Sequence, residues 1–153
     1  MRILMVCLGN ICRSPLAEGI LLNRIEKYNL DWKVDSAGTS SYHAGSLPDP
    51  RSITIAEKNG IDITYQRSRH FTVEDFDKFD LILTMDSSNY QNVKKLATNT
   101  TDINKIDLIM NYANPGRNIK VPDPYWGELG FEKVFGMLEK AVEGMLKRYV
   151  EEL

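Results

Sequence analysis

The chain opens with several chemically reactive side chains in one short turn. The run VCLGNICRSP, residues 6–15, contains two thiols, a guanidinium and a hydroxyl, supplied by Cys7, Cys12, Arg13 and Ser14. A thiol attacks only as a thiolate, and a nearby cation, helix N-terminus or hydroxyl donor favours that form. Arg13 supplies a cation and Ser14 a hydroxyl, so the turn is suited to keep Cys7 ionised as a nucleophile.

The same turn is suited to hold an anion. Gly9 and Asn10 both tolerate positive φ, so the backbone can curl and direct successive N–H groups inward. These N–H groups and the guanidinium of Arg13 match the three oxygens of a phosphoryl group. The five residues between Cys7 and Arg13 leave room for a loop around one tetrahedral dianion.

Other roles for the turn have to be weighed. A structural zinc site is not expected, because it needs about four ligands and the chain offers two cysteines and the distant His43 and His70. A redox pair of Cys7 and Cys12 and an inert, capped turn with buried thiols both stay open. A nucleotide P-loop is excluded, because the turn lacks the second glycine and the Lys-Ser/Thr pair of that motif.

A proton donor for a leaving group is predicted in the stretch VPDPYWG, residues 121–127. Prolines on either side of Asp123 restrict its backbone. Tyr125 and Trp126 could shield its carboxyl group from water, and such shielding raises a carboxyl pKa toward neutrality, as an acid catalyst needs. An ordinary Asp-Pro turn beside two core aromatics stays open as the alternative.

Alternating strands and helices are expected to position these residues. Continuous apolar runs predict buried strands at residues 2–6, 32–36, 80–85 and 106–110. Helical periodicity predicts helices at residues 15–28, 51–58, 87–97 and 129–150. We expect Ser14 to be the N-cap residue of the first helix, with Pro15 at its first position, and Asp86 or Ser87 to cap the third.

This alternation predicts an α/β fold in which a parallel sheet is covered by helices on both faces. We expect a single doubly wound domain of residues 1–153, with four parallel strands in the order 2-1-3-4. In such sheets ligands bind beyond the carboxyl ends of the strands. Cys7, Ser36 and Asp86 follow three of these ends.

Composition narrows the class of protein. The chain has 153 residues, 42% hydrophobic and 26% charged, with a net charge of −2, which is typical of a soluble globular protein. This small net charge produces no overall electrostatic field that would attract nucleic acid or an anionic membrane. The opening apolar run is too short for a signal peptide, and two cysteines make no disulfide framework, so we expect a cytoplasmic protein with reduced thiols.

Several motifs together resemble the low-molecular-weight protein-tyrosine phosphatase family. They are the run from Cys7 to Pro15 and, far downstream, Asp123-Pro124-Tyr125. Three further stretches match the family in order and spacing: Asp35-Ser36-Ala37-Gly38-Thr39, Pro48-Asp49-Pro50-Arg51 and Met85-Asp86-Ser87-Ser88-Asn89. The resemblance covers the whole chain.

The resemblance implies a role for each of these residues. Cys7 would form a phosphocysteine, Arg13 would clamp two phosphoryl oxygens, and Asp123 would act as general acid and then as general base. Ser36 and Asp86 would support the loop, or be a simple turn residue and a helix cap. Neither a metal nor a cofactor is implied. The phosphate-binding loop would comprise Leu8, Gly9, Asn10, Ile11, Cys12, Arg13 and Ser14.

The implied substrate is phosphotyrosine in proteins, with inorganic phosphate or vanadate as competitive ligands. The walls of a slot for its ring would be Ile11, Tyr42, Tyr125 and Trp126. Protein-arginine phosphatases are similar, but they typically place threonine where Ile11 stands, and an apolar side chain suits a phenyl ring better than a guanidinium. Arsenate reductases of this fold carry additional relay cysteines that this chain lacks.

Cys12 is not required for this chemistry. The family implies a reversible disulfide between Cys7 and Cys12 that protects the nucleophile from overoxidation. A small buried side chain is the alternative for Cys12. For the whole chain, the alternative to an enzyme is a non-catalytic module that binds phosphate or senses thiol oxidation.

Overall fold

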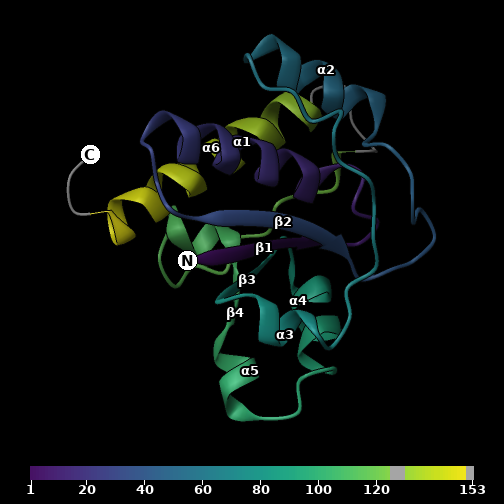
Figure 1. The fold of residues 1–153 in the computed structure, drawn as a ribbon, viewed down its shortest axis with the longest axis vertical. Helices are drawn as coiled ribbons and strands as arrows, with labels where there is room; N and C mark the ends of the chain where they lie inside the picture. Colours follow the sequence, from purple (N-terminus) through teal and green to yellow (C-terminus); the bar gives the residue numbers. More distant parts are fainter. Residues whose placement is uncertain (125–129, 151–153) are drawn as a thin grey trace.

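A four-stranded parallel sheet forms the centre of the computed structural model, which describes residues 1–124 and 130–150. Its strands are β1 (Arg2–Cys7), β2 (Lys33–Gly38), β3 (Leu81–Thr84) and β4 (Ile106–Leu108). They lie in the order β2-β1-β3-β4 (Figure 1). The predicted α/β fold, its strand order and its parallel sheet are confirmed.

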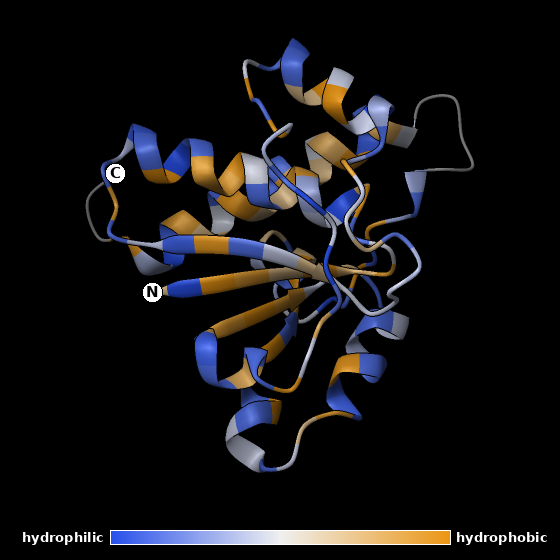
Figure 2. Ribbon diagram, turned by 45° about the vertical axis from the view of Figure 1, so that its right-hand side comes forward, coloured by the Kyte–Doolittle hydropathy of each residue, from blue (hydrophilic) through white to orange (hydrophobic). Residues whose placement is uncertain are grey.

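Two hydrophobic cores cover the two faces of this sheet. Alternate residues of β1 face opposite sides, so Ile3 and Met5 belong to one core and Leu4 and Val6 to the other. On the first face lie α1 (Arg13–Lys27), α2 (Pro50–Lys58) and α6 (Gly130–Tyr149). On the second lie α3 (Asp75–Lys78) and α4 (Ser87–Lys94), with α5 (Thr100–Asn104) beside β4. Figure 2 shows the apolar strands enclosed by helices whose outer faces are polar.

The strand register gathers the predicted site residues at one edge of the sheet. Cys7 pairs with Gly38, two residues after Ser36, and Val6 pairs with Thr84, two residues before Asp86. The carboxyl ends of β1, β2 and β3 therefore meet where α1 and α4 begin. This is the edge at which open α/β sheets bind ligands.

Most element predictions agree with the structure, and a few do not. The helix at residues 51–58 is present as α2, and the prediction that Asp86 caps the third helix is confirmed, because its side chain accepts the N–H of Asn89 at 2.8 Å. The strand predicted at 106–110 ends at Leu108, where a 3₁₀ helix (Ile109–Tyr112) begins. The short helices α3 and α5 carry too little periodicity to be found by pattern.

The N-cap prediction for Ser14 is wrong. Helix α1 begins at Arg13, and the residue in the N-cap position is Cys12, whose side chain makes no capping hydrogen bond. The hydroxyl of Ser14, which is fully buried, is used by the preceding loop instead. Within the described residues, no helix combines the length and the apolarity needed to cross a bilayer.

Candidate active site

The loop between β1 and α1 turns its carbonyl oxygens outward. Neighbouring segments donate to the carbonyls of Cys7, Leu8 and Ile11 from the N–H groups of Thr39, Ser40 and Asp49 at 2.8–2.9 Å. The carbonyls of Gly9 and Cys12 accept hydroxyl groups, from Ser68 at 2.9 Å and Ser52 at 3.3 Å. In the described part of the chain, the N–H groups of Gly9, Ile11 and Cys12 make no hydrogen bond. A curled backbone with inward N–H groups is an anion-binding nest.

Asn10 gives the loop its curl. Its φ of 55° is the left-handed conformation, which asparagine tolerates better than most residues. Gly9, which we expected to share this role, does not adopt a positive φ. A β-carbon at position 9 would instead lie 3.1 Å from Cδ2 of His43, so Gly9 permits the close approach of that ring.

The sulfur of Cys7 lies at the floor of this loop, within hydrogen-bond distance of a main-chain N–H and of a hydroxyl group. Cys7 is 3% exposed, at the end of β1. The N–H of Asn10 lies 3.3 Å from Sγ, and the hydroxyl of Ser14 lies 3.1 Å from it. Hydrogen bonds donated to sulfur favour the thiolate over the thiol. The geometry therefore suits a nucleophile beneath a bound anion.

Arg13 is fixed by contacts on one side of its guanidinium. Its NH1 donates to Oδ2 of Asp86 at 2.7 Å and to the carbonyl of Val121 at 2.9 Å, and the residue is 4% exposed. The other carboxylate oxygen of Asp86 caps α4, so this side chain joins the start of α4 to Arg13. Among the described residues, Nε and NH2 of Arg13 have no hydrogen-bond partner. A charge-assisted fork of this kind can take two oxygens of one anion.

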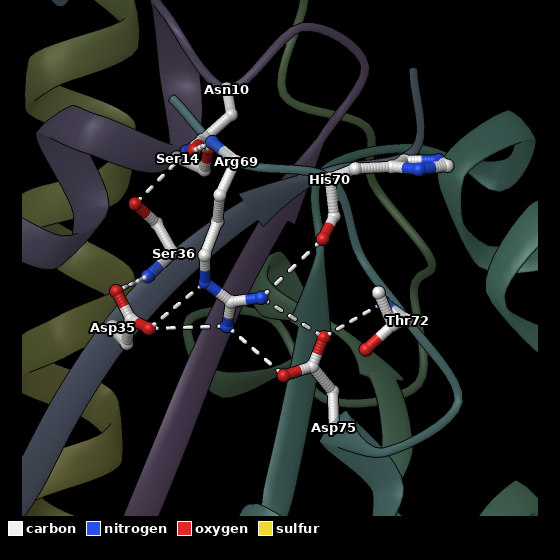
Figure 3. A network of polar contacts seen from close by, with 8 residues as sticks. All are labelled: Asn10, Ser14, Asp35, Ser36, Arg69, His70, Thr72 and Asp75. Carbon is white, nitrogen blue, oxygen red and sulfur yellow. Dashed lines mark hydrogen bonds and ion pairs between the residues drawn. The ribbon is translucent and has the colours of Figure 1, made fainter. Parts of the chain in front are cut away.

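A network of side chains behind the loop connects it to β2. The amide nitrogen of Asn10 donates to the hydroxyls of Ser14 at 2.8 Å and Ser36 at 2.9 Å. Its Oδ1 accepts the main-chain N–H of Arg69 at 3.0 Å. Figure 3 shows these residues together with the carboxylates of Asp35 and Asp75, which hold the guanidinium of Arg69. Ser36 thus lies where loop support was expected.

The loop forms the floor of a cavity of about 630 Å³. Asp123 lines it from the late loop, and Tyr42 and His43 line it from the segment after β2. Tyr42 is 86% exposed and meets His43 edge-on, with ring centroids 4.8 Å apart. Tyr125 and Trp126, the other predicted walls, lie outside the described residues. The remaining lining residues are Cys7, Leu8, Gly9, Ile11, Cys12, Arg13 and Ser40.

Cys12 differs from Cys7 in its electrostatic surroundings. Burial raises the pKa of the Cys12 thiol to about 12, and the electrostatic influence of the neighbouring Asp49, Cys7 and Asp123 acts in the same direction. Both cysteines are free thiols. Cys12 is therefore a neutral thiol at neutral pH. No group of three His, Cys, Asp or Glu side chains suited to a metal occurs within residues 1–124 and 130–150.

Three residues of the site were missed by sequence reasoning. A β-carbon on Gly38 would lie 2.8 Å from the carbonyl oxygen of Leu8, so this glycine lets the loop lie against the end of β2. Arg69 contacts the site through its main-chain N–H. Because almost every residue carries this group, the identity of the side chain does not indicate the contact. His43 has no recognisable motif around it. The stretch Ala37-Gly38-Thr39 did carry a signal for Gly38, because glycine at a strand end often marks a close backbone approach.

Comparisons with known proteins agree with this geometry. Residues 2–153 match the sequence profile of a family described as low molecular weight phosphotyrosine protein phosphatase. A relative with that name from Schizosaccharomyces pombe is 43% identical over 82% of this chain and 81% of its own. A protein tyrosine phosphatase from Entamoeba histolytica, solved with Hepes in its active site, superposes with a TM-score of 0.90 at 36% identity, covering 97% and 96% of the two chains. A drosophila arginine phosphatase superposes with a TM-score of 0.91 at 34% identity over the full length of both chains.

Proposed function

Because the chain belongs to the low-molecular-weight phosphotyrosine protein phosphatase family, we propose that it hydrolyses phosphotyrosine in proteins through a phosphocysteine on Cys7. One observation supports this most directly: the N–H of Asn10 and the hydroxyl of Ser14 lie within hydrogen-bond distance of the Cys7 sulfur. The same loop carries the N–H groups of Gly9, Ile11 and Cys12, which make no hydrogen bond within the described residues. We propose that residues 1–153 act as one phosphatase domain, in the cytoplasm.

In the first step the sulfur of Cys7 attacks phosphorus. The S–P bond forms as the P–O bond to the phenol breaks, and the loop N–H groups stabilise the equatorial oxygens in the transition state. Nε and NH2 of Arg13 take two of these oxygens, while Asp86 and the Val121 carbonyl hold NH1 in place. Asp123 donates its proton to the leaving phenolate.

In the second step water replaces the sulfur. Asp123, now a carboxylate, accepts a proton from water as the oxygen attacks phosphorus and the S–P bond breaks. The hydroxyl of Ser14 receives the departing sulfur anion. Atoms and charges balance without a metal or an external reductant, and inorganic phosphate is released. Phosphate or vanadate should therefore compete with substrate for the loop.

The cavity walls favour a flat aromatic ring. Ile11 and Leu8 present apolar surface above the loop, and the ring of Tyr42 stands exposed at the rim. A phenyl ring gains from burying this surface, whereas a guanidinium would lose hydrogen bonds to water there. The superposition on an arginine phosphatase makes phosphoarginine the second candidate substrate. The ratio of kcat/KM for phosphotyrosine and phosphoarginine peptides decides between them, and Ile11→Thr should move that ratio toward phosphoarginine.

Cys12 gives the nucleophile a resolving partner. A peroxide would oxidise the Cys7 thiolate to a sulfenic acid, and the Cys12 sulfur would then displace water to form the disulfide. Both thiols line the same cavity and belong to the same core. We propose that this disulfide protects Cys7 and that an external thiol restores it.

The test of the proposed function is the variant Cys7→Ser. It should hydrolyse p-nitrophenyl phosphate at less than about 10⁻³ of the wild-type rate, since the covalent step is lost. It should still bind inorganic phosphate, which can be followed by ³¹P NMR. Substantial turnover by Cys7→Ser, or its failure to bind phosphate while folded, would contradict the assignment. Cys12→Ser is the matched control and should keep most of the activity.

A further inference from the structure

The side-chain amide of Asn10 can be oriented in only one way. Its Oδ1 faces the main-chain N–H of Arg69 at 3.0 Å, and that group can only donate. The amide nitrogen must therefore donate both its protons, to Ser14 and to Ser36. Because the oxygen of Ser14 accepts from Asn10, its own proton remains for the sulfur of Cys7 at 3.1 Å.

An inverted amide would reverse this arrangement. If the oxygen of Asn10 faced Ser14, the serine would give its proton to that oxygen and not to sulfur. The single N–H of Arg69 thus decides whether the sulfur receives a hydroxyl donor. The side-chain direction of Asn10 is set from outside the loop.

The guanidinium of Arg69 fixes the position of that N–H. It binds Asp75 through two bonds, NH1 to Oδ2 at 3.1 Å and NH2 to Oδ1 at 3.0 Å, and Asp75 is 2% exposed. It also binds Oδ2 of Asp35 through Nε at 3.1 Å. Asp35 also accepts the N–H of Ser36 at 2.8 Å, so its side chain joins Ser36 and Arg69, two of the three partners of the Asn10 amide (Figure 3).

The main chain around Arg69 is tied to the strand that ends at the site. The N–H of Gly38 donates to the carbonyl of Arg69 at 2.8 Å, and the N–H of Phe71 donates to the carbonyl of Gly38 at 2.8 Å. This short parallel bridge, between Gly38 and His70, lies outside the four strands of the sheet. These main-chain bonds and the clamp on the guanidinium together hold the N–H on which the orientation of Asn10 depends.

We propose that Arg69 is a positioning residue for catalysis: its clamp by Asp35 and Asp75 orients Asn10, which in turn directs the hydroxyl of Ser14 to the sulfur of Cys7. This inference rests on the proposed function only in naming Cys7 as the nucleophile. The expected cost of losing a hydrogen bond to a charged atom is about tenfold or more in rate.

The test is Arg69→Lys, which keeps the positive charge but cannot bind Asp75 through two nitrogens. We expect kcat for p-nitrophenyl phosphate to fall about tenfold, while inhibition by inorganic phosphate changes less than about twofold, because Arg13 and the loop N–H groups still hold the anion. Alkylation of Cys7 by iodoacetamide at pH 6 should slow by a similar factor, with no change at pH 10. The alkylation assay does not depend on turnover, so it distinguishes failure of this inference from failure of the proposed function.

A double-mutant cycle separates positioning from general scaffolding. In a Ser14→Ala background, Arg69→Lys should change kcat and the pH 6 alkylation rate less than about twofold, because the hydroxyl is already absent. Losses that multiply in this background would overturn the proposal, as would unchanged kcat and alkylation in Arg69→Lys alone.

Two further variants serve as a matched control and as a replacement in case Arg69→Lys does not fold. Arg24→Lys is the matched control, because Arg24 is held by Glu143 at 2.9 Å and Glu139 at 3.1 Å away from the loop; it should leave all three measurements unchanged. If Arg69→Lys does not fold, Arg69→Met/Asp75→Asn removes the cation together with the buried carboxylate charge and keeps an acceptor for the N–H of Thr72. The same losses are expected from it, and wild-type values in the folded double variant would refute the role.

Discussion

Gly38→Ala should damage catalysis although residue 38 is not among the residues that line the cavity. A β-carbon there would lie 2.8 Å from the carbonyl oxygen of Leu8 and 3.1 Å from both the Gly9 carbonyl carbon and the Asn10 nitrogen. All three atoms are backbone, so no side chain can rotate away. Ordinary contact begins near 3.4 Å, so the loop must retreat by about 0.6 Å from β2.

The consequence can be worked out from the position of the sulfur. The Asn10 N–H donates to Sγ of Cys7 from 3.3 Å, and a displacement of that size weakens this bond and misaligns the neighbouring N–H groups. Misplacement by about 1 Å costs about 100-fold in rate. We therefore expect kcat/KM to fall about 10- to 100-fold, and the free energy of unfolding to fall by about 1–3 kcal/mol, as for other overpacked sites.

Steady-state hydrolysis of p-nitrophenyl phosphate and thermal unfolding measure these two effects. A loss of this size should lower Tm by about 2–10 °C in a chain of this length. Gly136→Ala is the control, because nothing lies within 4 Å of a β-carbon at that position in α6; it should leave activity unchanged and raise stability by up to about 1 kcal/mol. Wild-type kcat/KM in Gly38→Ala would show that the loop does not depend on this close contact.

Three other predictions follow from the same structure. Asp123→Asn should lower kcat/KM about 100-fold for phosphotyrosine but less than about fivefold for 2,4-dinitrophenyl phosphate, whose leaving group needs no proton; equal losses would refute the acid role. Because burial raises the pKa of Cys12 to about 12, iodoacetamide at pH 8 should label Cys7 and spare Cys12, as fragmentation of peptide 3–13 would show; comparable labelling of both would contradict this. Burial also raises the pKa of Glu18, which is 5% exposed and accepts the hydroxyl of Tyr65 at 2.7 Å. The folded state therefore binds the proton of Glu18 more tightly than the unfolded state does. The free energy of unfolding of the wild type should fall relative to that of Glu18→Gln as the pH rises from about 4 to 7, as measured by urea titration. A relative rise over this pH range would be inconsistent with the structure.

The sequence was sufficient for the fold and for the loop because their signals are local. Apolar runs and helical periodicity report burial directly, and the cysteine, arginine and serine of the loop are close together in the chain. The N-cap at Ser14 could not be predicted correctly, because a serine before a helix serves equally well as a cap or as a donor to sulfur, and only the position of Cys7 decides between them.

The parts that were missed depend on contacts between distant segments. Arg69 acts on Asn10 through a main-chain N–H, a group that every residue except proline carries. The need for glycine at position 38 arises from the approach of Leu8 and Asn10 across the sheet edge, and His43 reaches the cavity because Gly9 lacks a side chain. Such contacts follow from the strand register, and a glycine at the end of a strand, as at position 38, is the one local signal that they leave among these three residues.

Trapping the covalent intermediate tests the central claim most directly. Wild-type protein mixed with excess p-nitrophenyl phosphate and quenched within milliseconds in alkaline denaturant should carry one added phosphoryl group on Cys7, located by fragmentation of peptide 3–13, and ³¹P NMR should show a thiophosphate ester. The Cys12→Ser variant should give the same adduct. Turnover without any phosphoryl group on Cys7, or with the group on another residue, would contradict the mechanism.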